Sequence, residues 1–150
     1  MNLIGSILPV SHIVLNIEIS SKKRLFEQVG SLLETWVGLP GSSVFDCLFA
    51  REKLGSTGLG YGVAIPHGRH PDVHEITALF IRTKEPIDFD APDNKPVSLF
   101  FVLLVPETAT AAGNHLEILQ QLAERFNDKT VRDALIQACT PEEVRRLLTE

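Results

Sequence analysis

The fold is decided by one stretch of the chain, Gly58-Leu59-Gly60-Tyr61-Gly62-Val63-Ala64-Ile65-Pro66-His67-Gly68. Glycines at alternate positions of an extended segment indicate that another backbone or a ligand comes close, because a Cβ would clash there. We interpret Val63-Ala64-Ile65 as a short buried strand that ends at Pro66, since proline cannot donate to a sheet ladder. Gly68 is expected to let the chain turn sharply, so that His67 would stand on a rigid backbone at the end of a buried strand.

The residues before this stretch predict a strand and two helices. Residues 12–19 partly alternate and are rich in β-branched side chains, which favours a strand. Ser20-Ser21 can cap a helix whose apolar residues recur at helical spacing as far as Trp36. The basic residues at 22–24 oppose the dipole at the start of that helix. A second helix is expected over residues 42–53.

The residues after this stretch predict further strands and a helical C-terminal part. Residues 97–105 are almost continuously apolar, which is typical of a central strand buried on both faces. The other predicted elements are a loop over 69–72, a strand over 75–83, a short edge element over 86–90, a loop over 107–113, a helix from Asn114 with Leu116, Leu119, Leu122, Ala123 and Phe126 inward, a helix over 131–139, and a last helix from Pro141 capped by Thr140. Helices before and after a strand-rich middle predict an α/β fold, in which one domain (residues 1–150) has a mixed sheet of about five strands covered by helices on both sides.

Composition and charge disfavour several classes of protein. The 150 residues carry a net charge of −5 and form no basic stripe, so nucleic acid is not an expected partner. The longest apolar run is too short to span a bilayer, and the N-terminus lacks the basic start of a secretory signal. Cys47 and Cys139 lie far apart without metal-ligand spacing, so we expect reduced thiols in the core of a cytoplasmic protein.

The segment from Arg51 to Gly58, together with Ile65-Pro66-His67-Gly68, resembles the enzyme IIA domains of the bacterial phosphoenolpyruvate-dependent phosphotransferase system. The resemblance covers nearly the whole chain and is greatest to the mannitol/fructose-type branch and, within it, to the nitrogen-regulatory IIA proteins. It implies that His67 accepts a phosphoryl group from a phosphocarrier protein (HPr-like or NPr-like), which enzyme I supplies. The phosphorylation state would then act on downstream regulatory or transport proteins, and no cofactor is expected.

The resemblance also implies the other site residues. The family carries an arginine at the position of Arg51 and a second histidine at the position of His115, and it suggests Nε2 as the reacting nitrogen. A histidine nucleophile must be neutral, which its ordinary pKa of about 6.5 allows. The planar fork of Arg51 suits phosphate oxygens. His115 would face the same crevice if the sheet brings the strand ends together. Ser56, Thr57 and Gly68 are further candidates for contacts with the phosphoryl group.

Other functions fit parts of the sequence. His67, His70 and His74 have spacings that could collect a zinc ion, although Pro71 prevents a helix from placing all of them on one face. The glycine-rich stretch could also shape a peptide groove in a binding module without chemistry. Within the phosphotransferase family, the chain could be a sugar-specific component that passes the phosphoryl group to a IIB domain. The sequence contains no IIB or IIC domain, which favours the regulatory branch.

Overall fold

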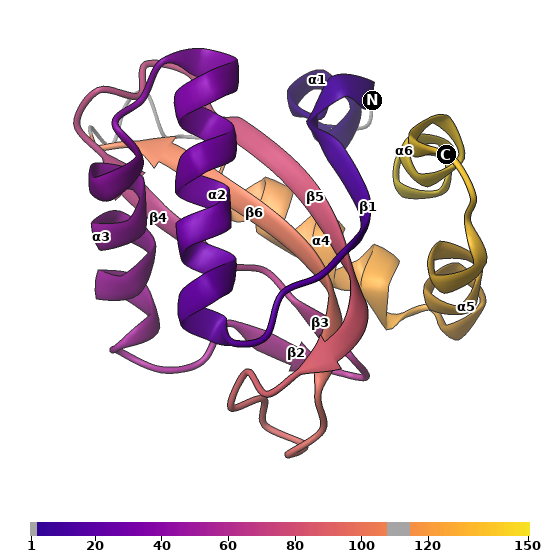
Figure 1. Cartoon of the computed structure of the whole chain (residues 1–150). Helices are drawn as coiled ribbons and strands as arrows, with labels where there is room; N and C mark the ends of the chain where they lie inside the picture. Colours follow the sequence, from indigo (N-terminus) through magenta and orange to yellow (C-terminus); the bar gives the residue numbers. More distant parts are fainter. Residues whose placement is uncertain (1–2, 108–114) are drawn as a thin grey trace.

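A mixed six-stranded β-sheet lies between two groups of helices in the computed structural model, which describes residues 3–107 and 115–150 (Figure 1). The strands are β1 (Ile13–Ile17), β2 (Gly58–Gly60), β3 (Val63–Ala64), β4 (His67–His70), β5 (Thr77–Ile87) and β6 (Val97–Pro106). The helices are α1 (Leu3–Ile7), the short 3-10 helix η1 (Val10–His12), α2 (Lys22–Val37), α3 (Gly41–Glu52), α4 (His115–Asn127), α5 (Lys129–Gln137) and α6 (Pro141–Thr149). The predicted α/β class with a covered mixed sheet is therefore confirmed.

Strand β6 is the central strand of the sheet and is almost entirely buried, as its apolar sequence predicts. Strand β5 runs antiparallel along one edge of β6, and β1 runs parallel to β5 on the outside. Along the other edge, β3 and β4 run parallel to β6 one after the other, with Val63 opposite Leu99 and His67 opposite Leu103. Pro66 lies between them and accepts a hydrogen bond from the Leu103 N–H at 2.9 Å. Strand β3 ends at Ala64, one residue earlier than predicted, and β4 resumes along the same neighbour directly after Pro66.

The sheet separates two hydrophobic cores because successive side chains of a strand point to opposite faces. Phe100 and Val102 belong to the core that α2 and α3 cover. Phe101 and Leu103 belong to the core that α1, α4, α5 and α6 cover. Figure 1 shows α2 and α3 side by side in front of the sheet and α4 behind it. One strand therefore contributes to both cores in alternation.

The helix ends follow the signals in the sequence. The Ser21 hydroxyl accepts a hydrogen bond from the Arg24 N–H at 3.2 Å, which caps α2, and Gly38 ends that helix with a φ of 77°. The Thr140 hydroxyl caps α6 in the same way through the Glu143 N–H at 3.2 Å. These predicted boundaries are confirmed.

The predicted inner face of α4 was partly wrong. Leu116 is 70% exposed and Ala123 is also exposed, whereas Ile118, Leu122 and Phe126 are buried. Those buried residues follow one another at intervals of one helical turn, so they form a narrow stripe. Leu116 lies well around the helix from that stripe and points away from the core.

The glycine-rich stretch forms a hairpin instead of one extended segment. Strands β2 and β3 pair antiparallel, and Tyr61 and Gly62 at the turn have φ values of 59° and 80°. A type I′ hairpin turn needs positive φ at both central positions, and glycine adopts it without strain. At Gly58 the predicted close approach is confirmed, because a Cβ there would lie 3.0 Å from Ala91 Cβ.

Gly68 does not turn the chain, contrary to the prediction. It lies inside β4 with Arg69 and His70, so the predicted loop from residue 69 is also wrong at its start. A Cβ on Gly68 would lie 2.6 Å from Cys47 Sγ and 2.8 Å from the Cys47 carbonyl oxygen. Glycine is needed here because β4 packs directly against α3.

Several smaller predictions have mixed outcomes. Cys47 is half-buried, and burial raises the pKa of its thiol to about 11, but Cys139 is exposed and is not a core thiol.

The strand predicted to end at residue 83 continues through Ile87 and includes part of the edge element. The predicted loop 107–113, apart from Glu107, and the predicted helix start at Asn114 lie outside the described residues. Within the described ranges, no helix combines the length and apolar character that crossing a membrane requires.

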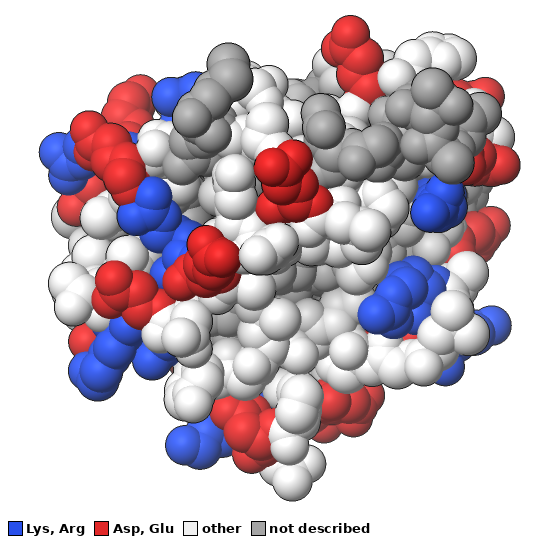
Figure 2. All heavy atoms as spheres, turned by 180° about the vertical axis from the view of Figure 1, so that it is seen from behind, with Lys and Arg blue, Asp and Glu red and all other residues white. Residues whose placement is uncertain are grey.

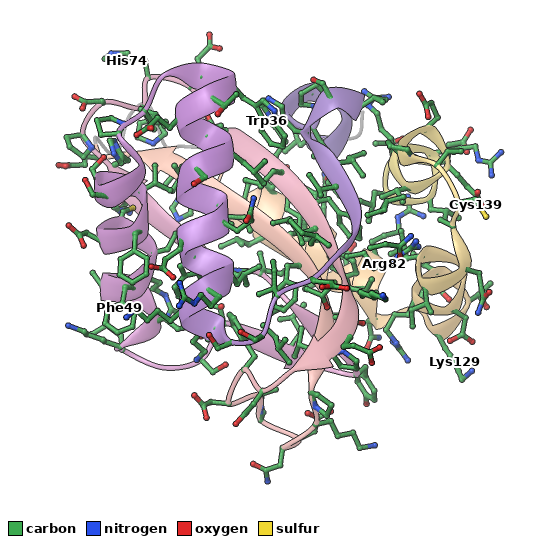
Figure 3. All side chains as sticks on the ribbon, in the orientation of Figure 1. Trp36, Phe49, His74, Arg82, Lys129 and Cys139 are labelled. Atoms are coloured by element: carbon green, nitrogen blue, oxygen red, sulfur yellow. The ribbon has the colours of Figure 1, made fainter. Side chains whose placement is uncertain are left out.

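A buried arginine that the sequence did not single out ties α5 to the sheet. Arg82 on β5 donates hydrogen bonds from Nη1 to the carbonyl oxygens of Leu135 and Ala138, at 2.8 and 2.7 Å (Figure 3). A cation is favourable at the C-terminal end of a helix, where carbonyl groups lack partners in the helix. Arg82 thus holds the C-terminal helices on the sheet.

Candidate functional site

His67 is the first residue of β4 and is half-buried. Its Nδ1 lies 2.8 Å from the carbonyl oxygen of Ile65. A carbonyl oxygen can only accept a hydrogen bond, so Nδ1 must carry the proton. In the neutral ring Nε2 then keeps its lone pair, which makes it the nucleophilic nitrogen.

The surroundings of His67 favour the neutral ring. Burial lowers the pKa of His67 below the usual histidine value, and the positive charges of Arg51 and His115 lower it further. The hydrogen bond to Ile65 and the charge of Glu52 act in the opposite direction without reversing the shift in this pKa. His67 is therefore neutral at neutral pH and able to act as a nucleophile.

The structure brings together the main site residues that the sequence predicted. Arg51 lies in the last turn of α3, His67 begins β4 and His115 begins α4. Arg51 and His115 are close enough for their charges to act on His67. The Arg51 Nη1 donates to the Gly55 carbonyl oxygen at 2.8 Å, which fixes the guanidinium and uses one of its several donors.

The hydroxyl groups of Ser56 and Thr57 hold the loop that precedes β2. Ser56 Oγ donates to the Phe89 carbonyl oxygen at 3.0 Å, and Thr57 Oγ1 donates to Glu52 Oε2 at 2.8 Å. Gly68 is buried against Cys47. Contacts of these residues with a phosphoryl group stay predictions.

Glu52 is the residue near the site that sequence reasoning missed. It is buried, and it interacts with Thr57, with Lys22 and through its charge with His67. A signal was present in the sequence, since Lys22 stands at a helix N-terminus, where a cation is unfavourable without an anionic partner. Nothing in the sequence, however, indicated which acidic residue would supply it.

His70 argues against the alternative of a zinc site. Its Nδ1 accepts from the Asp72 N–H at 3.0 Å, so its neutral Nε2 carries the proton that is shared with Ser43 Oγ at 2.8 Å. Both ring nitrogens are therefore engaged on the α3 side of the sheet, whereas His67 lies opposite Leu103, which faces the other core. Among residues 3–107 and 115–150, no group of His, Cys, Asp and Glu is arranged to hold a metal ion.

Comparison with known proteins places this chain in a family. The sequence model described as "Phosphoenolpyruvate-dependent sugar phosphotransferase system, EIIA 2" matches residues 6–150. The chain belongs to the EIIA 2 family. It is thus a phosphotransferase-system IIA protein, as the motif around His67 predicts.

Individual relatives narrow the resemblance within the EIIA 2 family. A nitrogen regulatory protein from Klebsiella oxytoca is 43% identical over 131 residues, which cover 87% of this chain and 80% of the relative. The crystal structure of the nitrogen regulatory protein IIA-Ntr from Neisseria meningitidis is 62% identical and superposes with a TM-score of 0.92 over 98% of this chain and 99% of that chain. The mannitol IIA protein of Escherichia coli, at 22% identity, has a TM-score of 0.78 over 94% of this chain and 98% of that chain, and so shares the fold.

Proposed function

We propose that this IIA protein is a regulatory phosphoryl carrier whose His67 accepts a phosphoryl group from a phosphocarrier protein supplied by enzyme I. The hydrogen bond of 2.8 Å between His67 Nδ1 and the Ile65 carbonyl is the observation that carries the proposal. It directs the lone pair to Nε2, and the lowered pKa keeps that lone pair available at neutral pH.

In the proposed step, the Nε2 lone pair attacks phosphorus on the carrier. The Nε2–P bond forms while the bond between phosphorus and the carrier breaks, and the electron pair of that bond returns to the carrier. The Nδ1 proton stays in place. As the ring gains positive character, its hydrogen bond to Ile65 becomes stronger, which stabilises the transition state more than the ground state.

Arg51 and His115 fit the electrostatic part of this reaction. Negative charge collects on the equatorial oxygens of the transferred group, and catalysis rests on positioning and on the stabilisation of that charge. Arg51 is held by Gly55 at the end of α3, and His115 lies at the start of α4. Both are proposed to face the phosphoryl oxygens while His67 attacks.

Exposed leucines beside the site favour a protein as the partner. Leu54, which is 84% exposed, follows Arg51 closely in the chain, and Leu116, which is 70% exposed, follows His115 directly. Apolar side chains exposed around a reactive group are typical of a surface that another protein covers. Figure 2 shows the molecule from behind, where uncharged side chains cover much of the face between separate groups of acidic and basic side chains. A folded phosphocarrier suits such a surface better than a free anion does.

The regulatory role is favoured over sugar transport by the relatives. Those at 43% and 62% identity are named nitrogen regulatory proteins, whereas the mannitol protein is only 22% identical. A phosphoryl group would add about −1.5 to −2 charges to the docking surface, so the two states would suit different downstream regulatory or transport partners. A relay that starts from phosphoenolpyruvate would operate in the cytoplasm.

Intact mass spectrometry tests the proposal directly. The protein and its His67→Ala variant are incubated with phosphoenolpyruvate, enzyme I and a phosphocarrier. We expect one acid-labile phosphoryl group on the wild type and none on the variant. A wild type that gains no mass with a competent donor set would refute the proposal, and a gain on the variant would move the acceptor to another residue.

A further inference from the structure

A buried carboxylate lies at the end of α3, immediately after Arg51. The side chain of Glu52 is only 3% exposed. It accepts hydrogen bonds from the Thr57 N–H at 3.0 Å, from Thr57 Oγ1 at 2.8 Å and from Lys22 Nζ at 3.2 Å. Lys22 in turn bonds Asp90 at 3.2 Å and lies over the ring of Phe89.

Stability alone does not account for this carboxylate. A negative charge in the last turn of a helix opposes the helix dipole, and Glu52 is the last residue of α3. The desolvation of a buried ion pair also offsets most of its attraction, so a buried pair is weak evidence for a stabilising role. Glu52 is therefore better explained by what it holds in place.

The hydrogen bonds of Glu52 lead to His67 through the backbone. Both polar groups of Thr57 that can donate are bound to Glu52. The Thr57 carbonyl oxygen accepts from the Ile65 N–H at 3.0 Å, and the Ile65 carbonyl oxygen lies 2.8 Å from His67 Nδ1. Ile65, whose carbonyl oxygen sets the tautomer of His67, is thus anchored through its N–H on Thr57, the residue before β2 that Glu52 holds.

We propose that Glu52 is a positioning residue for phosphoryl transfer, which fixes Thr57 and, through Ile65, the ring orientation and tautomer of His67. This inference rests on the proposed function of His67 as phosphoryl acceptor. The negative charge of Glu52 also acts on His67 directly, in the direction that favours the protonated ring. Glu52 therefore affects both the geometry and the charge state of the nucleophile without touching the phosphoryl group.

The test compares Glu52→Leu and Glu52→Gln with wild type by ¹⁵N NMR of the histidine rings and by the rate of phosphoryl uptake. Glu52→Leu removes the acceptor of Thr57, so we expect a mixture of His67 tautomers and uptake slower by about tenfold, as for other residues that orient a reacting group. Glu52→Gln keeps one acceptor oxygen but loses the charge. We expect it to retain the Nδ1–H tautomer, to have a lower His67 pKa and to lose less of the rate.

Asp90→Asn is the matched control. Asp90 is the other acidic partner of Lys22, but its carboxylate is 78% exposed, and the hydrogen bonds of Thr57 go to Glu52. We expect wild-type tautomer, pKa and uptake in this variant. A loss of rate in Asp90→Asn equal to that in Glu52→Leu would refute the specific role of Glu52.

The remaining outcomes separate positioning from mere stability. If Glu52→Leu takes up phosphoryl groups slowly while its His67 tautomer and pKa match wild type, the proposal is wrong. If Glu52→Leu does not fold, Glu52→Gln decides, and an unchanged His67 pKa with an unchanged rate overturns the proposal. General loosening of the site would raise the pKa of His67 towards the ordinary value, which is opposite to the expected shift. A wild type that accepts no phosphoryl group refutes the proposed function instead. The tautomer measurement then still tests whether Glu52 fixes the ring of His67 through Thr57 and Ile65.

Discussion

Two histidines of the same four-residue strand show how the surroundings, and not the residue type, assign a role. His67 is half-buried and has its Nδ1 bound to a carbonyl oxygen, whereas His70 is 1% exposed and has both nitrogens bound, to Asp72 and Ser43. The first ring is held by Nδ1, so that its Nε2 keeps the lone pair. The second ring is part of the contact between β4 and α3.

The contrast follows because successive side chains of a strand point to opposite faces of the sheet. His67 points to the side of α4, and Gly68 and His70 point to the side of α3. Glycine at position 68 allows β4 to lie against α3, and this close contact places His70 among partners for both nitrogens. His67 at the start of the strand instead binds the Ile65 carbonyl oxygen through Nδ1 and lies near Arg51 and His115.

The largest expected difference is between His67→Ala and His70→Ala. The first variant should fold normally and accept no phosphoryl group. The second should still accept one but lose about 1–3 kcal/mol of unfolding free energy, because the part-buried hydrogen bonds of His70 with the Asp72 N–H and the Ser43 hydroxyl are lost. Intact mass and urea denaturation measure the two effects. Loss of phosphorylation in a folded His70→Ala variant would contradict the assignment of a purely structural role to His70.

Removing the charges around His67 should slow transfer without moving the site. For Arg51→Ala we expect uptake slower by about a hundredfold, as for other lost donors to a developing charge. Arg51→Lys should recover only part of this, because an ammonium lacks the planar fork. His115→Ala should lose less than Arg51→Ala. Rapid-quench measurement of uptake checks these rates. An Arg51→Ala variant as fast as wild type would show that Arg51 has no role in the transfer.

Gly68→Ala tests the close contact that separates the two histidines. The new Cβ would overlap Cys47, so the variant should lose about 1–3 kcal/mol of unfolding free energy. Gly5→Ala in α1 is the control, since its Cβ would make an ordinary contact of 3.4 Å with Thr149 in α6. Chemical denaturation of both variants provides the measurement. Equal stability of the two would show that β4 can move away from α3 without penalty.

The smallest expected effect is a shift in the titration of His67. Its pKa lies below the ordinary value of about 6.5, so the ring stays neutral as the pH falls through that value and becomes charged only at lower pH. The unfolded chain binds this proton at a higher pH than the folded protein does, because a charged ring is unfavourable in the half-buried site. The contribution of His67 to the free energy of unfolding is therefore lost as the pH falls below the unfolded-state pKa. In Arg51→Ala the pKa of His67 should rise, because a repelling positive charge is gone. NMR titration of the ring detects the shift, and a fall would contradict it.

The sequence predicted the α/β fold, the central strand β6 and the helix caps, because periodicity and caps are local signals, whereas Arg51 and His115 were expected beside His67 from the family resemblance. It misplaced Gly68 and His70, since a glycine that allows a turn and a glycine that allows close packing are identical in sequence. It could not identify Glu52, whose partners Lys22 and Thr57 meet it only in the folded chain. The basic start of α2 indicated that an anionic partner was needed, but the pairing of Lys22 with Glu52 joins residues far apart in the chain and could not be identified before folding.

The most direct test of the account is the identity of the phosphorylated nitrogen. The protein labelled with ¹⁵N in its histidines is phosphorylated by a phosphocarrier, and the ring nitrogens of His67 are observed by NMR before and after. Because Nδ1 donates to the Ile65 carbonyl, we expect a dominant Nδ1–H tautomer before the reaction and phosphorus on Nε2 after it. Phosphorus on Nδ1, or a His67 ring that begins as the Nε2–H tautomer, would contradict the account.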